Sequence, residues 1–92
     1  MATFITFAHG TTATATTAGY AVHNPAGQLT GRVHIRRDFS GRRWLADCFA
    51  FDGYTWTLDV RTSPATMADT RAAVRTWCET IDRHARNCRL PN

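Results

Sequence analysis

Apolar and polar side chains alternate along two stretches in the middle of the chain. Residues 29–38 place Leu29, Val33 and Ile35 at alternating positions, with basic side chains between them. Residues 54–61 alternate in the same way. A period of two residues is typical of a strand with one buried and one exposed face. We therefore expect a strand in each stretch.

Three further segments complete a predicted sheet. Turn signals at residues 24–27, 40–41 and 52–53 separate apolar runs that are rich in β-branched and aromatic residues. A low-complexity Thr/Ala run at residues 10–19 is expected to form a turn that flows into a strand, because nothing in it specifies a register. The strands are expected at about residues 3–9, 15–23, 29–38, 43–51 and 54–61.

The Ser40–Gly41 turn predicts how the two strands that flank it pair. A two-residue hairpin loop brings the basic side chains of the first strand opposite Asp47 and Phe49 of the second. The expected cross-strand pairs are Arg32 with Phe49, Val33 with Cys48, His34 with Asp47, and Ile35 with Ala46.

The next hairpin has two candidate registers. A three-residue loop at 51–53 pairs Ala50, Cys48 and Ala46 with Tyr54, Trp56 and Leu58. A two-residue loop at 52–53 flips the last strand, and groups Leu45, Phe49 and Phe51 with Trp56 and Leu58. We expect the first register, because it leaves Thr55, Thr57 and Asp59 in water, although a slip of one residue inverts the faces. The expected inner face is Val33, Ile35, Ala46, Cys48, Ala50, Tyr54, Trp56, Leu58 and Val60.

A helical period replaces the strand period over residues 64–88. Ser63–Pro64 is a helix start signal, and Thr66 with Asp69 offers a second one. The apolar stripe comprises Met67, Val74, Cys78, Ile81, Ala85 and Cys88, with Trp77 at its edge. The expected solvent face pairs Arg75 with Glu79, Glu79 with Arg83, and Asp82 with Arg86 at helical spacing.

These elements predict one α+β domain spanning residues 1–92: an antiparallel β-meander of four to five strands with a single C-terminal amphipathic helix on one face. A chain of 92 residues is one domain with a thin core. The small side chains Ala46, Cys48 and Ala50 are expected to leave room beneath the helix for Met67, Trp77 or Ile81.

Charge adds a preference for an anionic partner. All eleven basic residues are Arg, and the formal net charge is +4. Arg makes forked contacts to phosphate and carboxylate that Lys cannot make. A GC-rich genome would also write Arg and Ala by default, so the composition alone leaves both explanations open.

The cysteines and the N-terminal segment predict a cytoplasmic protein. Three cysteines without tight spacing are not a secreted disulfide framework, and Cys48 and Cys78 are expected to meet in the core as reduced thiols. The first ten residues lack the basic region and continuous apolar stretch of a signal peptide. No run approaches the roughly 18 apolar residues of a membrane span.

The outer face of the predicted sheet is the candidate binding site. Arginines interleaved with an exposed aromatic ring suit single-stranded nucleic acid, because Arg neutralises phosphate and the ring stacks on a base. The candidate residues are Arg32, His34, Arg36, Arg42, Arg43, Leu45 and Phe49. Alternatively, the N-terminal strands or a second copy of the chain cover this face. Phe49 and Leu45 would then be core, and His34 with Asp47 a local ion pair.

The sequence contains few residues in patterns typical of catalytic, metal or cofactor sites. A ribonuclease that used His34, held by Asp47, lacks a second base at fixed spacing. His84 and Cys88 are a chelating pair on the helix, but no second pair has ligand spacing. We therefore expect no enzyme activity, no metal and no cofactor.

The order strand–strand–strand–helix, with Gly31–Ile35 and Gly41–Leu45, is loosely similar to small domains of plant transcription factors and phage integrases that read DNA with a sheet. The likeness covers about half of the chain and is one of topology, which does not determine function. It places the chain in no family.

Two functions therefore compete. The first is a nucleic-acid or nucleoprotein binder that uses the outer sheet face. The second is an inhibitor or adaptor from a phage or mobile element, of the anti-CRISPR kind, that blocks a protein partner by covering an acidic or nucleic-acid-binding surface with the same face. A homodimer is compatible with either, because a sheet edge and an apolar face remain open.

Overall fold

A computed structural model describes residues 4–64 and 66–88, except for the side chains of residues 4 and 85–88. Six strands form one antiparallel sheet in sequential order, and one helix follows. The strands are β1 (Phe4–Thr6), β2 (Thr12–Ala15), β3 (Gly19–His23), β4 (Leu29–Arg37), β5 (Trp44–Phe51) and β6 (Trp56–Thr62), and the helix is α1 (Met67–Cys88). The α+β meander is confirmed, with more strands than the expected four to five.

The additional strand comes from the Thr/Ala run, which forms a hairpin of its own. Gly19 donates to the hydroxyl of Thr16, and its carbonyl accepts the Thr16 amide, so the chain reverses between β2 and β3. Thr12 and Thr14 therefore share one face of β2, while Ala13 and Ala15 share the other. The segment expected to be a turn and one strand is a strand, a turn and a strand.

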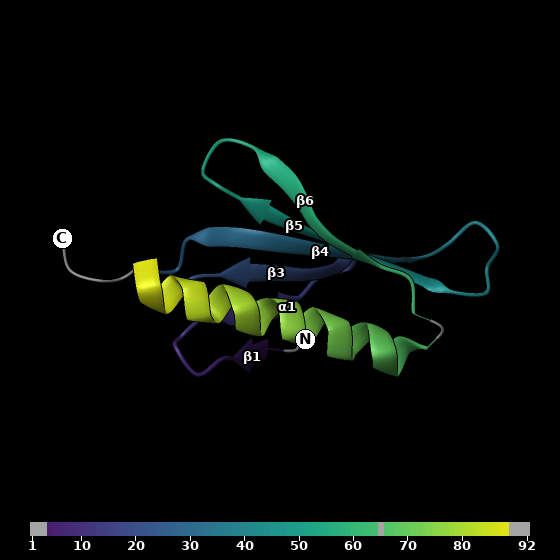
Figure 1. Ribbon diagram of the computed structural model, residues 1–92, viewed down its shortest axis with the longest axis horizontal. Coiled ribbons are helices and arrows are strands. Elements are labelled where there is room, and N and C mark those ends of the chain that lie inside the picture. The colour runs from purple at the N-terminus through teal and green to yellow at the C-terminus, as the bar shows by residue number, and fades with distance from the viewer. Residues whose placement is uncertain (1–3, 65, 89–92) are drawn as a thin grey trace.

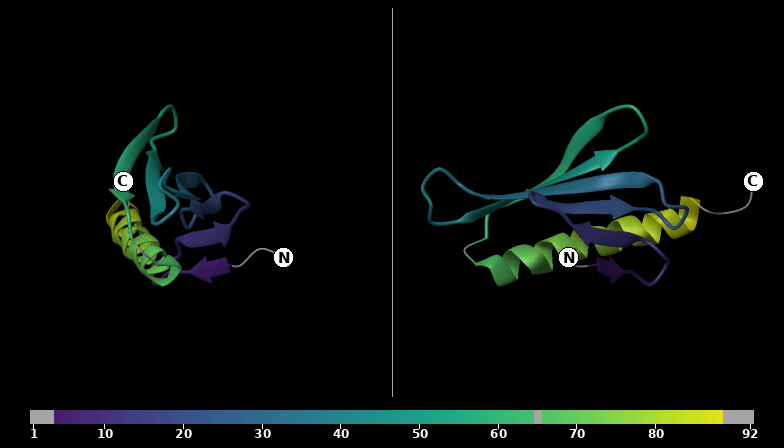
Figure 2. Two further views of the ribbon diagram at one scale, coloured as in Figure 1. Left: turned by 90° about the vertical axis from the view of Figure 1, so that its right-hand side faces the viewer. Right: turned by 180° about the vertical axis from the view of Figure 1, so that it is seen from behind.

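The sheet curls around α1, which lies along its inner face (Figures 1 and 2). β1 and β6 form the two edges of the sheet, and the hairpin of β5 and β6 projects beyond the helix. None of the described elements covers the outer face. Within the described residues, no helix has both the length and the apolar character needed to cross a membrane.

The core fills the space between α1 and the inner face of the sheet, and includes Phe7 after β1 and Ala13 of β2. The sheet contributes Val22, Val33, Ala46 and Cys48, and the helix contributes Val74, Trp77 and Cys78. Trp77, expected at the edge of the apolar stripe, is buried, and its indole Nε1 donates to Asp59 Oδ2 at 2.7 Å. A residue expected in water thus satisfies the polar atom of the largest core side chain.

The helix begins three residues later than the earliest expected start signal. Thr66 is the N-cap, because its Oγ1 accepts the amide of Asp69 at 3.1 Å. Pro64 lies outside the helix and binds the sheet instead, since its carbonyl accepts a hydrogen bond from the amide of Trp44. The second of the two start signals in the sequence is therefore the one used.

Asp82 is buried, which corrects the prediction that it pairs with Arg86 on the solvent face. Its Oδ2 accepts the His9 amide at 2.8 Å and its Oδ1 accepts the Thr11 amide at 3.0 Å. Burial raises the pKa of this carboxyl, but the bonds from His9 and Thr11 outweigh it and hold the pKa below its ordinary value. Asp82 thus ties the end of α1 to the turn between β1 and β2. The Arg86 side chain lies outside the described residues.

The hairpin of β4 and β5 has the predicted register. Arg32, Val33, His34 and Ile35 face Phe49, Cys48, Asp47 and Ala46. The loop is longer than expected, because Asp38 donates to the Arg43 carbonyl and residues 39–42 close the turn. Both loops give the same strand pairing, so the faces were predicted correctly.

The hairpin of β5 and β6 contradicts the preferred register. Phe51 pairs with Trp56, and Phe49 pairs with Leu58, so both partners lie on the outer face and not the inner one. Tyr54, also expected inside, is exposed in the loop. The Asp52 carboxylate accepts the amides of Tyr54 and Thr55, which closes a longer loop than either alternative assumed.

A bulge at Asp59 then restores Val60 to the inner face. Cys48 pairs with Val60, whereas the neighbouring Phe49 pairs with Leu58, so Asp59 is the extra residue. Arg61 follows on the outer face, opposite Asp47. Of the β6 residues assigned to the inner face, Val60 alone lies there.

Candidate functional site

Aromatic rings gather on the outer face of β4, β5 and β6. The rings of Phe51 and Trp56 stack across the strands, with centroids 4.7 Å apart and planes at 26°. His34 meets Phe49 edge to face at 5.9 Å. Trp56 is 37% exposed, and its neighbour Leu58 is 42% exposed. The outer face therefore exposes a set of flat apolar groups, whose positions are fixed by the pairing of β4, β5 and β6.

Arg32 joins the two ring pairs. Its guanidinium carbon lies 5.3 Å from the Trp56 ring centroid, in a cation–π contact. Its Nε and Nη2 lie 3.1 and 3.0 Å from His34 Nε2. Because Arg only donates, His34 accepts at Nε2 and carries its proton on Nδ1. The cationic group is thus held over the aromatic surface.

Asp47 lies beside these rings, and is only 5% exposed. Arg61 binds it in a fork, with Nε 2.6 Å from Oδ1 and Nη2 3.0 Å from Oδ2. Arg36 Nη2 lies 3.9 Å from Oδ2. The hydrogen bonds from Arg61 lower the pKa of Asp47 against the raising effect of burial, and the charges of Arg61 and Arg36 add to the lowering. The carboxylate is thus neutralised, and the face remains basic.

The hairpin tip supplies separate groups. Arg43 is tethered, because its Nε donates to the Ser63 carbonyl at 2.7 Å. Arg42 is exposed, as is the neighbouring Phe39, which is fully in solvent. Arg37 stacks on Trp44 at 4.3 Å on the opposite, inner side of the ladder.

The structure brings five of the seven predicted site residues together. Arg32, His34, Arg36, Leu45 and Phe49 share the outer face of β4 and β5, whereas Arg42 and Arg43 lie at the hairpin tip. Leu45 and Phe49 are half-buried. Four residues of the same face were missed: Phe51, Trp56, Leu58 and Arg61. The flipped register, which grouped Phe49 and Phe51 with Trp56 and Leu58, was the signal that could have found the first three.

The N-terminal strands do not cover this face, which corrects one of the alternatives. β1, β2 and β3 extend the sheet edge to edge beyond β4. His34 and Asp47 are cross-strand neighbours as predicted, but Asp47 makes its ion pairs with Arg61 and Arg36.

Other candidate chemistry is sparse in the described part of the chain. Asp47, the carboxylate proposed to hold His34 as a base, is hydrogen-bonded by Arg61. Within the described residues, no three His, Cys, Asp or Glu side chains are grouped to hold a metal ion. The Cys88 side chain, half of the proposed pair with His84, lies outside the described residues.

Cys48 and Cys78 are buried free thiols in the core, as predicted. Burial raises the pKa of Cys48 to about 12, with a smaller contribution from the neighbouring Cys78, and burial likewise raises that of Cys78 to about 12. Such thiols stay protonated and act as small apolar side chains.

No protein-family model, curated protein or solved structure matches this chain. The functional inference therefore rests on the residues of the outer face and their geometry.

Proposed function

We propose that the chain is a non-enzymatic, cytoplasmic binding protein that holds single-stranded nucleic acid on the outer face of its sheet. The observation that carries the proposal is the Arg32 guanidinium, held between the Trp56 ring and His34. Bases stack on exposed rings, and fixed guanidinium groups contact the phosphates between them.

The surrounding charges support this partner. The net charge of +4 comes from arginines alone, and Asp47 on the outer face is already paired with Arg61. Arg42 extends the basic surface to the hairpin tip beside the exposed ring of Phe39. An extended strand of nucleic acid is the anionic partner that presents both phosphates and unpaired bases to such a face.

The proposal is tested by fluorescence anisotropy with labelled single-stranded RNA and DNA at several salt concentrations. Trp56→Ala should weaken binding by about 1–3 kcal/mol if one base stacks on that ring. Tyr54→Ala is the matched control, because Tyr54 is an exposed aromatic in the adjacent loop and is not part of the Phe51–Trp56 stack. Arg32→Gln should reduce the salt slope by about 0.7, whereas Arg83→Gln on the helix should leave it unchanged. Absence of binding to single- and double-stranded probes at low salt would refute the proposal.

The second candidate is an inhibitor or adaptor that binds a protein, of the anti-CRISPR kind. Partly exposed Trp56 and Leu58 with arginines around them also resemble the centre of a protein interface, where Trp and Arg are enriched. A pull-down with and without nuclease separates the two functions. A stoichiometric protein partner that survives nuclease and is lost in Trp56→Ala favours inhibition, and loss of the partner on nuclease treatment favours the first proposal.

A further inference from the structure

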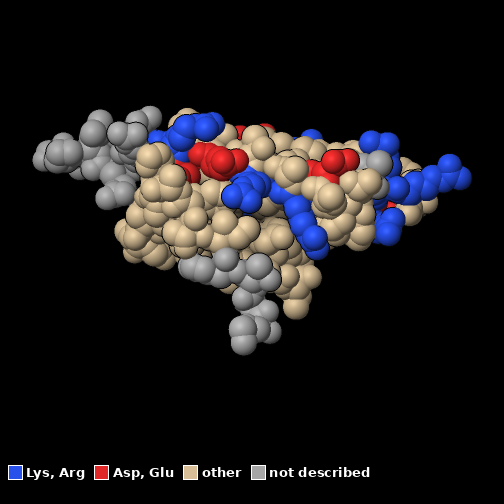
Figure 3. Space-filling model, turned by 90° about the horizontal axis from the view of Figure 1, so that it is seen from below, with Lys and Arg blue, Asp and Glu red and all other residues tan. Residues whose placement is uncertain are grey.

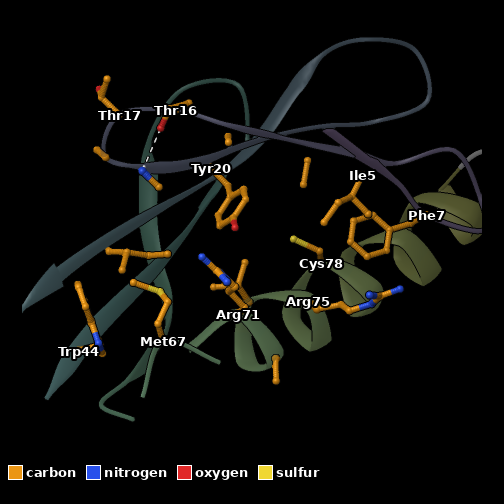
Figure 4. A pocket seen from close by; sticks show the side chains of 17 residues that line it. Ile5, Phe7, Thr16, Thr17, Tyr20, Trp44, Met67, Arg71, Arg75 and Cys78 are labelled. Carbon is orange, nitrogen blue, oxygen red and sulfur yellow. Dashed lines mark hydrogen bonds between the residues drawn. The ribbon is translucent and has the colours of Figure 1, made fainter. Parts of the chain in front are cut away.

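A groove separates the N-terminal half of α1 from the inner face of β1, β2 and β3 (Figure 4). Its volume is about 890 Å³. Ile5, Phe7 and Tyr20 form its apolar wall on the sheet, and Met67 and Val74 form the wall on the helix. It lies on the opposite face of the sheet from the candidate nucleic-acid surface, so the two sites are independent.

The Thr/Ala run explains why this part of the core is hollow. Ala13 and Ala15 point towards the groove from β2, while the intervening threonines point to the outer face. Alanine side chains are short, and α1 packs closest to β5 and β6, so space is left between the N-terminal half of α1 and β2. At the other end of the helix, Asp82 ties α1 to the turn that precedes β2. The groove thus lies beside the N-terminal half of α1, while Asp82 anchors the C-terminal half to the sheet.

Two arginines stand at the groove. Arg71 and Arg75 occupy successive turns of α1, and both side chains are exposed. Figure 4 shows Arg71 directed towards Tyr20, with Arg75 beside the helix further along. The described residues that line the groove include neither Asp nor Glu, and Arg71 and Arg75 take no part in the ion pairs that Asp47 makes with Arg61 and Arg36. In Figure 3, charged side chains form a band along one side of the molecule, next to a broad uncharged surface.

We propose that the groove binds an amphipathic organic anion: an elongated apolar body with one carboxylate head, of the fatty-acid class. A volume of about 890 Å³ lies within the range of small-molecule sites. The apolar body displaces water from the walls, and Arg71 and Arg75 receive the carboxylate, for which a guanidinium supplies a matching fork of donors.

The direct test is displacement of anilinonaphthalene sulfonate, a fluorescent apolar anion, by monomeric dodecanoate. Ala15→Leu places three extra carbons in the groove and should weaken binding of both molecules. Ala21→Leu adds the same volume on the outer face, opposite Arg32, and should leave binding unchanged. Ala18→Leu is a second groove-filling variant, at an exposed turn position where folding is less demanding. Circular dichroism confirms that each variant folds.

The charge requirement is tested separately. Arg71→Gln with Arg75→Gln should weaken dodecanoate binding by about tenfold or more, since each charge-assisted bond contributes more than a neutral one. Arg83→Gln, two turns further along the helix, should have no effect, and neutral dodecanol should bind more weakly than dodecanoate. Equal binding of dodecanol, or unchanged binding in both groove-filling variants, would overturn the proposal. A dimer in sedimentation that Ala15→Leu dissociates, with no dodecanoate binding, would instead assign the groove to a second copy of the chain.

Discussion

At the scale of single residues, two buried carboxylates connect segments that are distant in the sequence. Asp82 joins the helix to the turn between β1 and β2, and Asp47 joins β5 to Arg61 of β6. Each is almost excluded from water, at 3% and 5% exposure, and each is fully hydrogen-bonded. Burying a charge is tolerated only when such partners replace water.

Asp82→Asn should destabilise the fold by about 1–3 kcal/mol near neutral pH, because the amide has one acceptor oxygen where two amides donate. Since the folded pKa of Asp82 is below the ordinary value of 3.8, its stabilisation is present above that pH and is lost as the pH falls further. The difference between the variant and the parent should therefore shrink in acid. Urea unfolding at several pH values measures it, with exposed Asp69→Asn as the control. Equal stability at neutral pH would show that Asp82 is dispensable.

The two core thiols should resist modification. With a pKa of about 12, each of Cys48 and Cys78 is ionised to about one part in ten thousand at pH 8. Treatment with an aromatic disulfide reagent at about pH 8, followed by mass mapping, should leave both unlabelled until denaturant is added. Rapid labelling of either residue in the native protein would contradict its burial.

At the scale of elements, the Trp77 ring of α1 lies directly against β4 because β4 carries Gly31 at that position. A Cβ at Gly31 would lie 2.9 Å from Cη2 of Trp77 and 3.4 Å from the Phe49 carbonyl. Trp77 has little freedom to withdraw, because its indole is bonded to Asp59 of the β6 bulge. The glycine and the bulge therefore act together to place the one tryptophan that the helix buries in the core.

Gly31→Ala should cost about 1–3 kcal/mol, as expected of overpacking. In a Trp77→Phe background the smaller ring leaves space, so the same substitution should cost less. A double-mutant cycle by urea denaturation measures this coupling. Additive effects of the two substitutions would mean that the close approach does not constrain the helix.

At the scale of the whole molecule, the curled sheet encloses α1 on one side and leaves the other side uncovered by any described element (Figure 2). The uncovered face carries the stacked rings and the fixed arginine, and the covered face carries the core and the groove. The helix closes the core and forms one wall of the groove. The described pairs predicted along its surface, Arg75 with Glu79 and Glu79 with Arg83, do not form ion pairs.

Acid should unfold the whole domain cooperatively. Hydrogen bonds lower the pKa of Asp38, Asp47, Asp52 and Asp82 in the folded chain. The unfolded chain therefore binds more protons near and below pH 4, and stability falls as the pH decreases through that region. The urea midpoint should be nearly constant from about pH 7 to about pH 5 and then decline. A midpoint unchanged down to about pH 2 would contradict the folded-state role of these carboxylates.

Local pattern was sufficient for the fold class, for the helix stripe and for the pairing of β4 with β5. Periods of two and of 3.6 residues, together with turn residues, are properties of neighbouring positions. Packing between distant segments decided the rest. Either register of β5 with β6 gives an alternating strand, and the choice depended on the Asp52 loop, the Phe51–Trp56 stack and the Asp59 bulge. The sequence predicts Asp82 as a surface charge, because the amides of His9 and Thr11 that bury and bind it come from a distant part of the chain. The alanines of β2 do not predict a groove from the sequence. A short side chain leaves a groove only where a helix lies over the strand, and that depends on the tertiary structure.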